Sequence, residues 1–267
     1  MRGTFKSKDH IKNIADQLDV MRKVLVASDD PEVRFRLKID KDNIFINNAD
    51  KDDSLFINYR IDPKATFEDY SVVVDEIGIW DVGQFISLLR KYSTKIYKTD
   101  AKVKLDFDKN RFIFSCGKDM DEFYTCAPKA LRESQGEPDL SRLDESLKFV
   151  LKNENIAKLL MNMNIYSEQK NVVFTGKSGA TEFQAVVCTL DRANQHTGKI
   201  VVEEVEVRED IQISFNKQKL KAILESNDSP EMVLYNSKGS TRAGKFSYSG
   251  DNYEMKFLVG RQSKKKV

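Results

Sequence analysis

Apolar and polar residues alternate along most of the chain. In the segment 33–39, for example, Val33, Phe35 and Leu37 occupy every second position, with arginine and lysine between them. A period of two is typical of an antiparallel strand with one face in a core and the other in water. The same pattern, or a short apolar run bounded by turn residues, marks the segments 43–47, 54–60, 70–77, 102–108, 111–116, 121–127, 146–151, 171–176, 181–190, 200–207, 210–215, 231–236, 244–249 and 252–259. The pattern therefore predicts a meandering antiparallel sheet over most of the chain.

Four short segments have the period of a helix instead. In each, apolar residues lie three and four positions apart after a residue that caps helix N-termini well. The four predicted caps are Ser7, Asp81, Asn153 and Asn216. They lie 63 to 74 residues apart, so a helix followed by a block of strands recurs four times. This recurrence predicts two repeats in each of two similar domains.

A polar segment separates the second repeat from the third. Residues 128–145 hold two of the five prolines and show no sustained period. We therefore predict an N-terminal domain over 1–127, a connector over 128–145 and a C-terminal domain over 146–267. The predicted fold class is α+β, with two helices packed on antiparallel sheets in each domain.

The composition narrows the class of protein. Lys and Arg number 44 and Asp and Glu 42, so the chain is not basic throughout, although local basic patches are compatible with this balance. No apolar run approaches the ~20 residues of a membrane span, and the N-terminus lacks the apolar core of a signal peptide. The three cysteines form no C-x-x-C pair and indicate reduced thiols. We expect a cytoplasmic protein.

The sequence contains no recognisable catalytic or metal-binding motif. It has no P-loop, no G-x-S-x-G and no dinucleotide fingerprint, and only two histidines, His10 and His196. The segment 48–52 begins like a calcium loop, but Asp53 stands where the glycine is needed and Tyr59 where the final glutamate is needed. We therefore predict no enzymatic activity, no metal and no cofactor.

The helix faces opposite the apolar stripes are rich in lysine and arginine. Acidic residues gather elsewhere, at 29–30, 50–53 and 203–206. A basic helix face is often simply solvated, but four helices with the same bias favour binding to a polyanion. The candidate DNA-binding residues are Lys8, Lys12, Arg90, Lys91, Lys152, Lys158, Lys217 and Lys221.

Several segments resemble the DNA polymerase sliding clamps of T-even-type bacteriophages. Residues 79–89, Ile-Trp-Asp-Val-Gly-Gln-Phe-Ile-Ser-Leu-Leu, resemble the clamp segment in which an apolar–aromatic–Asp sequence opens a helix. Segments 155–163 and 215–224 resemble the third and fourth helices of such clamps, and 244–258 resembles their final hairpin. The resemblance covers the order of elements along the chain, while residues before 77 match weakly.

The resemblance implies a function as well as a fold. It implies the DNA clamp fold, a homotrimeric ring that encircles double-stranded DNA without reading its sequence, a clamp loader, and a replicative DNA polymerase that the ring tethers. For a bacteriophage protein the compartment is the cytoplasm of the host cell. It also implies that strand 111–116 pairs with a strand near 172–183 of a neighbouring subunit. The implied partner-binding residues are Leu140, Leu143, Pro230, Phe257 and Val259, although Phe257 and Val259 equally suit a core.

The alternative is a monomeric DNA-binding or single-strand-binding processivity subunit. Such a protein stacks bases on aromatic side chains interleaved with cations on a strand face. Phe112 and Phe114 beside Arg111 come closest to this pattern, which also suits a core. Mass in solution separates the two, since a trimer of 30.7 kDa chains has three times the mass of the monomer.

Overall fold

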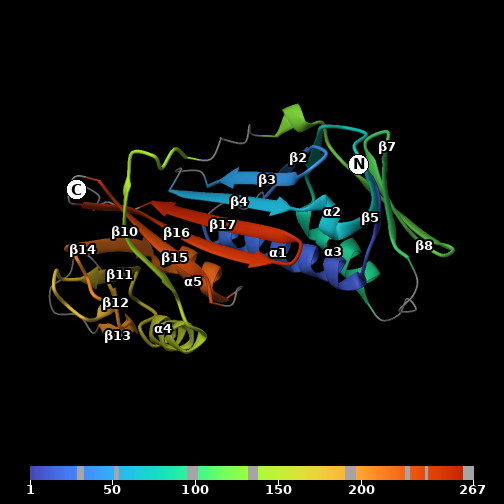
Figure 1. Ribbon diagram of the computed structural model, residues 1–267. Helices are drawn as coiled ribbons and strands as arrows, with labels where there is room; N and C mark the ends of the chain where they lie inside the picture. Colours follow the sequence, from blue (N-terminus) through green and yellow to red (C-terminus); the bar gives the residue numbers. More distant parts are fainter. Residues whose placement is uncertain are drawn as a thin grey trace. The chain divides into compact units, whose positions relative to one another are not determined.

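The computed structural model describes residues 1–28, 33–50, 54–94, 102–131, 138–189, 197–225, 229–237 and 240–260, except for the side chains of 240 and 241. The chain forms two compact units (Figure 1). Unit 1 comprises 1–49, 57–137 and 249–255. Unit 2 comprises 50–56, 138–248 and 256–267.

Unit 1 contains two long helices that pack against each other, α1 (Lys8–Val26) and α3 (Val82–Ser93). Both begin at the predicted caps. Ser7 Oγ accepts a hydrogen bond from the His10 amide at 3.2 Å, and Asp81 Oδ1 accepts one from the Gln84 amide at 2.9 Å. Unit 1 also has a one-turn helix, α2 (Pro63–Thr66), and a short 3₁₀ helix, η1 (Pro128–Ala130).

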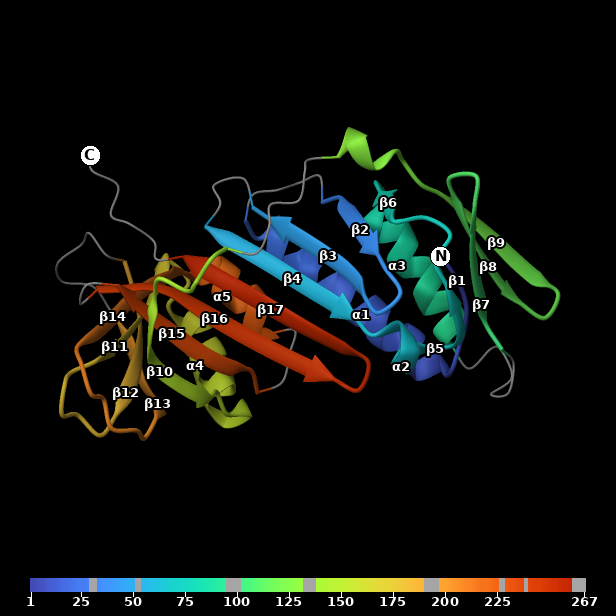
Figure 2. The same cartoon turned by 45° about the horizontal axis from the view of Figure 1, so that its top comes forward.

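The strands of unit 1 form two groups. One sheet has the order β5 (Phe67–Ser71), β1 (Arg2–Phe5), β7 (Lys104–Asp108), β8 (Arg111–Cys116) and β9 (Asp119–Tyr124), and Figure 2 shows the last three side by side. The other group has the order β4 (Leu55–Ile61), β3 (Ile44–Ala49), β2 (Phe35–Ile39) and β6 (Glu76–Ile79). The turn between β7 and β8 has two residues at positive φ, Lys109 at 46° and Asn110 at 66°, as a tight hairpin requires.

The core of unit 1 lies where α1 and α3 meet the strands. A cavity of about 30 Å³ is lined by side chains of both helices and of both strand groups, among them Leu18, Phe85, Leu37 and Phe112. Phe85 packs on Phe112 at 5.2 Å between ring centroids. The apolar stripes of the helices are therefore buried, and the opposite faces carry the polar residues.

Unit 2 contains the other two long helices, α4 (Asn153–Ile165) and α5 (Lys217–Glu225). A four-stranded sheet has the order β13 (Gly198–Glu203), β12 (Phe183–Cys188), β11 (Asn171–Gly176) and β14 (Ile211–Asn216). The remaining strands are β10 (Asp144–Val150), β15 (Glu231–Ser237), β16 (Ser240–Gly250) and β17 (Tyr253–Gly260). Aromatic rings link the core of the unit, running from Phe149 through Phe183, Phe174 and Phe215 to Phe246.

The structure corrects three details of the predicted elements. β1 is missing from the prediction because a strand of four residues gives too short an alternation to recognise. The predicted strand 70–77 is two strands, β5 and β6, in different strand groups. Asn216 caps α5 as predicted, but Asn153 is the first residue of α4, and its side chain accepts hydrogen bonds from Ser229 instead.

The predicted subunit-interface strands are wrong. β8 pairs with β7 on one side and β9 on the other, and β11 lies between β12 and β14. Neither strand has a free edge for a neighbouring subunit. Within the described residues, the strands paired on one side only are β5 and β9 in the first sheet and β13 and β14 in the sheet of unit 2.

Two short segments depart from a simple division of the chain at the connector. Residues 249–255 belong to unit 1, where the Asn252 carbonyl accepts a hydrogen bond from the Asp62 amide and the Gln17 side chain donates to the Tyr253 hydroxyl. Residues 50–56 belong to unit 2, where the Ser54 carbonyl accepts a hydrogen bond from the Gly260 amide. Such long-range exchanges leave no local pattern in the sequence.

Candidate nucleic-acid interface

In unit 1 the candidate DNA-binding face consists of the outward sides of α1 and α3. Together the two helices carry six cations and three carboxylates, which leaves three positive charges. Four of the cations are the predicted residues Lys8, Lys12, Arg90 and Lys91; the other two, Arg22 and Lys23, lie in the last two turns of α1. The prediction of a basic face is therefore confirmed for this unit.

A cluster of charges joins the two helices. Asp19, with 9% of its side chain exposed, accepts hydrogen bonds from Arg22 at 3.0 Å and from Arg90 at 3.1 Å, and Lys23 approaches it at 3.2 Å. Burial acts to raise the pKa of Asp19, but the hydrogen bonds from these three cations outweigh it and lower the pKa below the ordinary value. Arg90 also lies 3.4 Å from Asp16. The predicted DNA-binding group of Arg90 is therefore held between carboxylates.

The other three predicted residues of unit 1 differ in their surroundings. Lys91 lies 2.5 Å from Asp121, and this hydrogen bond, together with one from Tyr92, lowers the pKa of Asp121. Lys8 is half-buried at the start of α1. Lys12 is exposed. Of these residues, Lys12 is the best placed to reach a phosphate.

In unit 2 the prediction is wrong for Lys217, which is buried rather than exposed. Its ammonium group donates hydrogen bonds to the carbonyls of Met163, Tyr166 and Ser167 at the end of α4, at 3.3, 3.0 and 2.6 Å. These carbonyls have no intrahelical donors, and a cation at this position also complements the helix dipole. Burial lowers the pKa of Lys217, and the nearby charge of Lys221 acts in the same direction. Lys217 is thus a structural cap.

A second lysine of α5 is also buried. Lys219 Nζ lies 2.5 Å from Asp50 Oδ2 and 2.6 Å from Ser54 Oγ, and the Lys219 and Asp50 side chains are only 9% and 0% exposed. Asp50 also accepts hydrogen bonds from the amides of Ser54 and Leu55. The acidic residue that begins like a calcium ligand is therefore half of a buried ion pair, while residues 51–53 lie outside the described part of the chain.

The remaining predicted cations of unit 2 lie at the surface. Lys158 is exposed on α4, Lys152 precedes α4 and lies 3.4 Å from Glu203, and Lys221 donates to Asn164 at 2.8 Å. With Lys217 and Lys219 buried, Lys158 and Lys221 are balanced by one acidic residue on each helix. The surface of α4 and α5 therefore has no net positive charge, contrary to the prediction.

The predicted partner-binding residues all lie in unit 2. Leu140 and Leu143 are half-buried, with a hydrogen bond from the Leu143 amide to the Leu140 carbonyl. Pro230 is buried, Phe257 is 0% exposed and packs on Tyr248, and Val259 is 2% exposed. Phe257 and Val259 are therefore core residues of β17, so the prediction that they present a docking surface is corrected.

The candidate residues for single-strand binding are also in the core. Phe112 and Phe114 are both 0% exposed, and Phe114 stacks on Tyr92. They offer no aromatic surface to a base. Among the described residues, no group of His, Cys, Asp and Glu is arranged to hold a metal ion, and His196 lies outside them. No helix in the described part of the chain is long and apolar enough to span a membrane.

Solved structures with the same fold are clamp proteins. No protein-family model and no curated protein matches the sequence. The PCNA2–PCNA3 complex from Sulfolobus tokodaii matches 99% of this chain and 100% of its own, with a TM-score of 0.68 and 13% identity. Proliferating Cellular Nuclear Antigen from Entamoeba histolytica gives 0.68 at 13% identity over 98% of both chains, and A. fulgidus PCNA bound to the C-terminal region of FEN-1 gives 0.67 at 13% over 99% of both. The chain therefore has the PCNA-like clamp fold, and the predicted α+β clamp fold is confirmed.

Proposed function

We propose that the protein is a sliding clamp that encircles duplex DNA and tethers a DNA polymerase, with no catalytic activity of its own. The observation that carries the proposal is the clamp fold over essentially the whole chain, in which α1 and α3 present a net basic face. Cations on helices bind phosphates without reading bases, which suits a protein that must slide.

The ring would be a homotrimer of chains with two clamp domains, 1–127 and 146–267, and a connector over 128–145. We infer that β9 of one subunit pairs with β13 of the next, because each is the edge of its sheet. Met120 and Tyr124 of β9 are 63% and 62% exposed, and Val201 of β13 is 36% exposed. An edge with exposed apolar side chains is a hazard unless another strand covers it, and head-to-tail pairing that closes into a ring would cover it.

Partners would dock on unit 2. The half-buried Leu140 and Leu143 lie in the connector, beneath which the resemblance to clamps places peptides of the polymerase and the clamp loader. The FEN-1 segment bound to A. fulgidus PCNA supports peptide docking in a protein of this fold. The resemblance of 79–89 and 244–258 to T-even-type clamps supports a bacteriophage source and a place in the host cytoplasm.

The test must separate encirclement from ordinary electrostatic binding. Linear duplex DNA is incubated with the protein at high concentration so that rings thread over the ends, and both ends are then blocked with streptavidin. After a wash in high salt, a ring should stay on the blocked DNA and leave once a restriction enzyme cuts the duplex. Light scattering should give a mass near 92 kDa, three times 30.7 kDa.

Two results would overturn the proposal. A mass of 30.7 kDa at all concentrations would favour the monomeric alternative. Complete release by salt from end-blocked DNA would show that binding is electrostatic only, because salt weakens phosphate contacts but cannot open a closed topology.

A further inference from the structure

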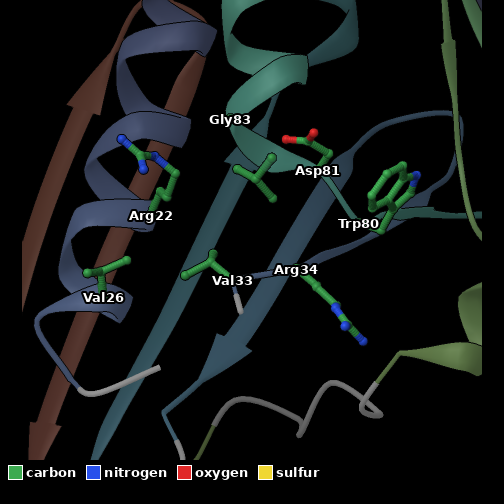
Figure 3. A pocket seen from close by; sticks show the side chains of 8 residues that line it. Arg22, Val26, Val33, Arg34, Trp80, Asp81 and Gly83 are labelled. Carbon is green, nitrogen blue, oxygen red and sulfur yellow. The ribbon is translucent and has the colours of Figure 1, made fainter. Parts of the chain in front are cut away.

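Unit 1 has an open pocket of about 340 Å³ on the side where α1 ends and α3 begins. Its wall comes from three elements: the last turns of α1, the start of β2 and the first turn of α3. Figure 3 shows Arg22 and Val26 on one side, Trp80 and Asp81 on the other, and Val33 and Arg34 below. None of these residues belongs to the proposed DNA-binding or partner-binding sets.

The inner surface of the pocket is apolar. Val33 and Val82 are 8% and 2% exposed and form its floor, while Val26 and Trp80 are 48% and 54% exposed at its sides. Single exposed apolar residues are ordinary on a protein surface, but here a valine and the indole border the same hollow. The Trp80 indole N–H donates to the Tyr124 carbonyl at 3.1 Å, which fixes the ring in place.

The rim of the pocket is positively charged. Arg22 and Arg34 lie on it, and Arg22 shares the single charge of Asp19 with Lys23 and Arg90. The acidic residue of the rim, Asp81, caps α3 by accepting the Gln84 amide at 2.9 Å. The pocket therefore combines an apolar floor with an excess of positive charge at its edge.

We propose that this pocket binds an acidic peptide segment of a partner protein, with one apolar side chain inserted between Val26, Val33 and Trp80. The flanking carboxylates would lie against Arg22 and Arg34, which form bidentate contacts with carboxylates well. The volume is at the small end for ligand pockets and fits one anchoring side chain. A single-stranded nucleic acid fits less well, since it needs a track of stacking aromatic faces rather than a valine floor.

This surface goes beyond the proposed clamp function, because it gives unit 1 a partner site of its own and does not depend on a ring. Trp80 is the only tryptophan of the chain, so its fluorescence and its single indole N–H resonance report on the pocket directly. The probe is a blocked peptide with leucine between two glutamates on each side. Binding should shift the Trp80 emission and indole resonance in a saturable way.

The specificity of the probe is tested on both sides. A peptide with lysine in place of glutamate, and one with serine in place of leucine, should each bind at least tenfold more weakly. Arg34→Ala and Val26→Asp should weaken binding of the original peptide at least tenfold. The matched controls are Lys38→Ala, an exposed cation farther along β2, and Val73→Asp, an exposed valine elsewhere in unit 1; both should stay within twofold.

Three results would overturn the proposal. The first is the absence of any Trp80 signal with the acidic peptide at millimolar concentration. The second is equal binding of the acidic, basic and serine peptides, which would show nonspecific association. The third is a Trp80 shift with a thymidine oligonucleotide and none with the peptide, which would make the pocket a nucleic-acid site. Arg34→Ala changes an exposed side chain, so its result stands even where Val26→Asp perturbs folding.

Discussion

Removing the charge of Lys219 should destabilise unit 2 severely, although the sequence places this lysine on a basic, exposed helix face. In the structure its ammonium group lies 2.5 Å from the fully buried Asp50. Lys219→Met removes the cation in direct contact with that carboxylate. Breaking a buried pair from one side typically costs about 3–5 kcal/mol. Because Asp50 still accepts the amides of Ser54 and Leu55, we expect a loss of about 3 kcal/mol, at the lower end of that range.

The reverse substitution should cost more. Asp50→Asn leaves a buried ammonium group facing a neutral amide, with the Ser54 hydroxyl at 2.6 Å, so we expect a loss of about 4 kcal/mol. The double variant Lys219→Met/Asp50→Asn buries no charge at this position. It should therefore lose less than the sum of the single variants, with a coupling of about 1–3 kcal/mol.

The measurement is the free energy of unfolding from urea titrations followed by circular dichroism. Lys221→Met is the matched control, since it removes a partly exposed lysine from the same helix and should cost no more than about 0.5 kcal/mol. A loss below about 1 kcal/mol for both single variants would refute the reasoning, because it would show that water or a neighbour replaces the missing partner at little cost.

Three further predictions address the surface, the assembly and pH. Replacing Lys12 and Lys158 with glutamine should reduce the salt slope of duplex binding by about 0.9 for each phosphate that is no longer bound, whereas Lys91→Gln, at a cation already paired with a carboxylate, should change it little; fluorescence anisotropy between about 50 and 200 mM salt measures both, and equal slopes would contradict this ranking. Met120→Pro should yield monomers in light scattering, because it removes a donor from the edge of β9, and an unchanged trimer would exclude this interface. For Lys217, the lowered pKa means that the unfolded chain binds the proton more tightly, so stability should rise as pH approaches 10.5, and this rise should be absent in Lys217→Met.

The sequence predicts the elements of the fold well because they depend on local patterns. A period of two for strands and three or four for helices is visible over any short window, and side-chain caps such as Ser7, Asp81 and Asn216 lie next to the helices they begin. Asn153 fails as a cap for a reason that is not local. Its side chain bonds to Ser229, 76 residues away.

The site is predicted less well, because charge on a helix face does not reveal what lies opposite. Lys217 and Lys219 look like solvated residues of an amphipathic helix, yet one caps α4 and the other pairs with Asp50. The edge strands also escape prediction, since β8 and β9 show similar alternation and only the strand order decides which is free. The pocket wall formed by Trp80 and Arg22 brings together residues that are 58 positions apart.

The distribution of charge explains why encirclement, rather than affinity, would have to hold this protein on DNA. Of the eight predicted cations, Lys217 is buried, and Arg90, Lys91, Lys152 and Lys221 already contact acidic or amide oxygens. Each phosphate contact contributes a factor that falls steeply with salt, so a face with few available cations binds weakly at physiological ionic strength. Weak contacts with the backbone let a ring slide, but they would let an open protein dissociate. A clamp built from this chain would therefore depend on closure at its strand edges, and disruption of the β9 edge should abolish retention on end-blocked DNA even where the helix faces are intact.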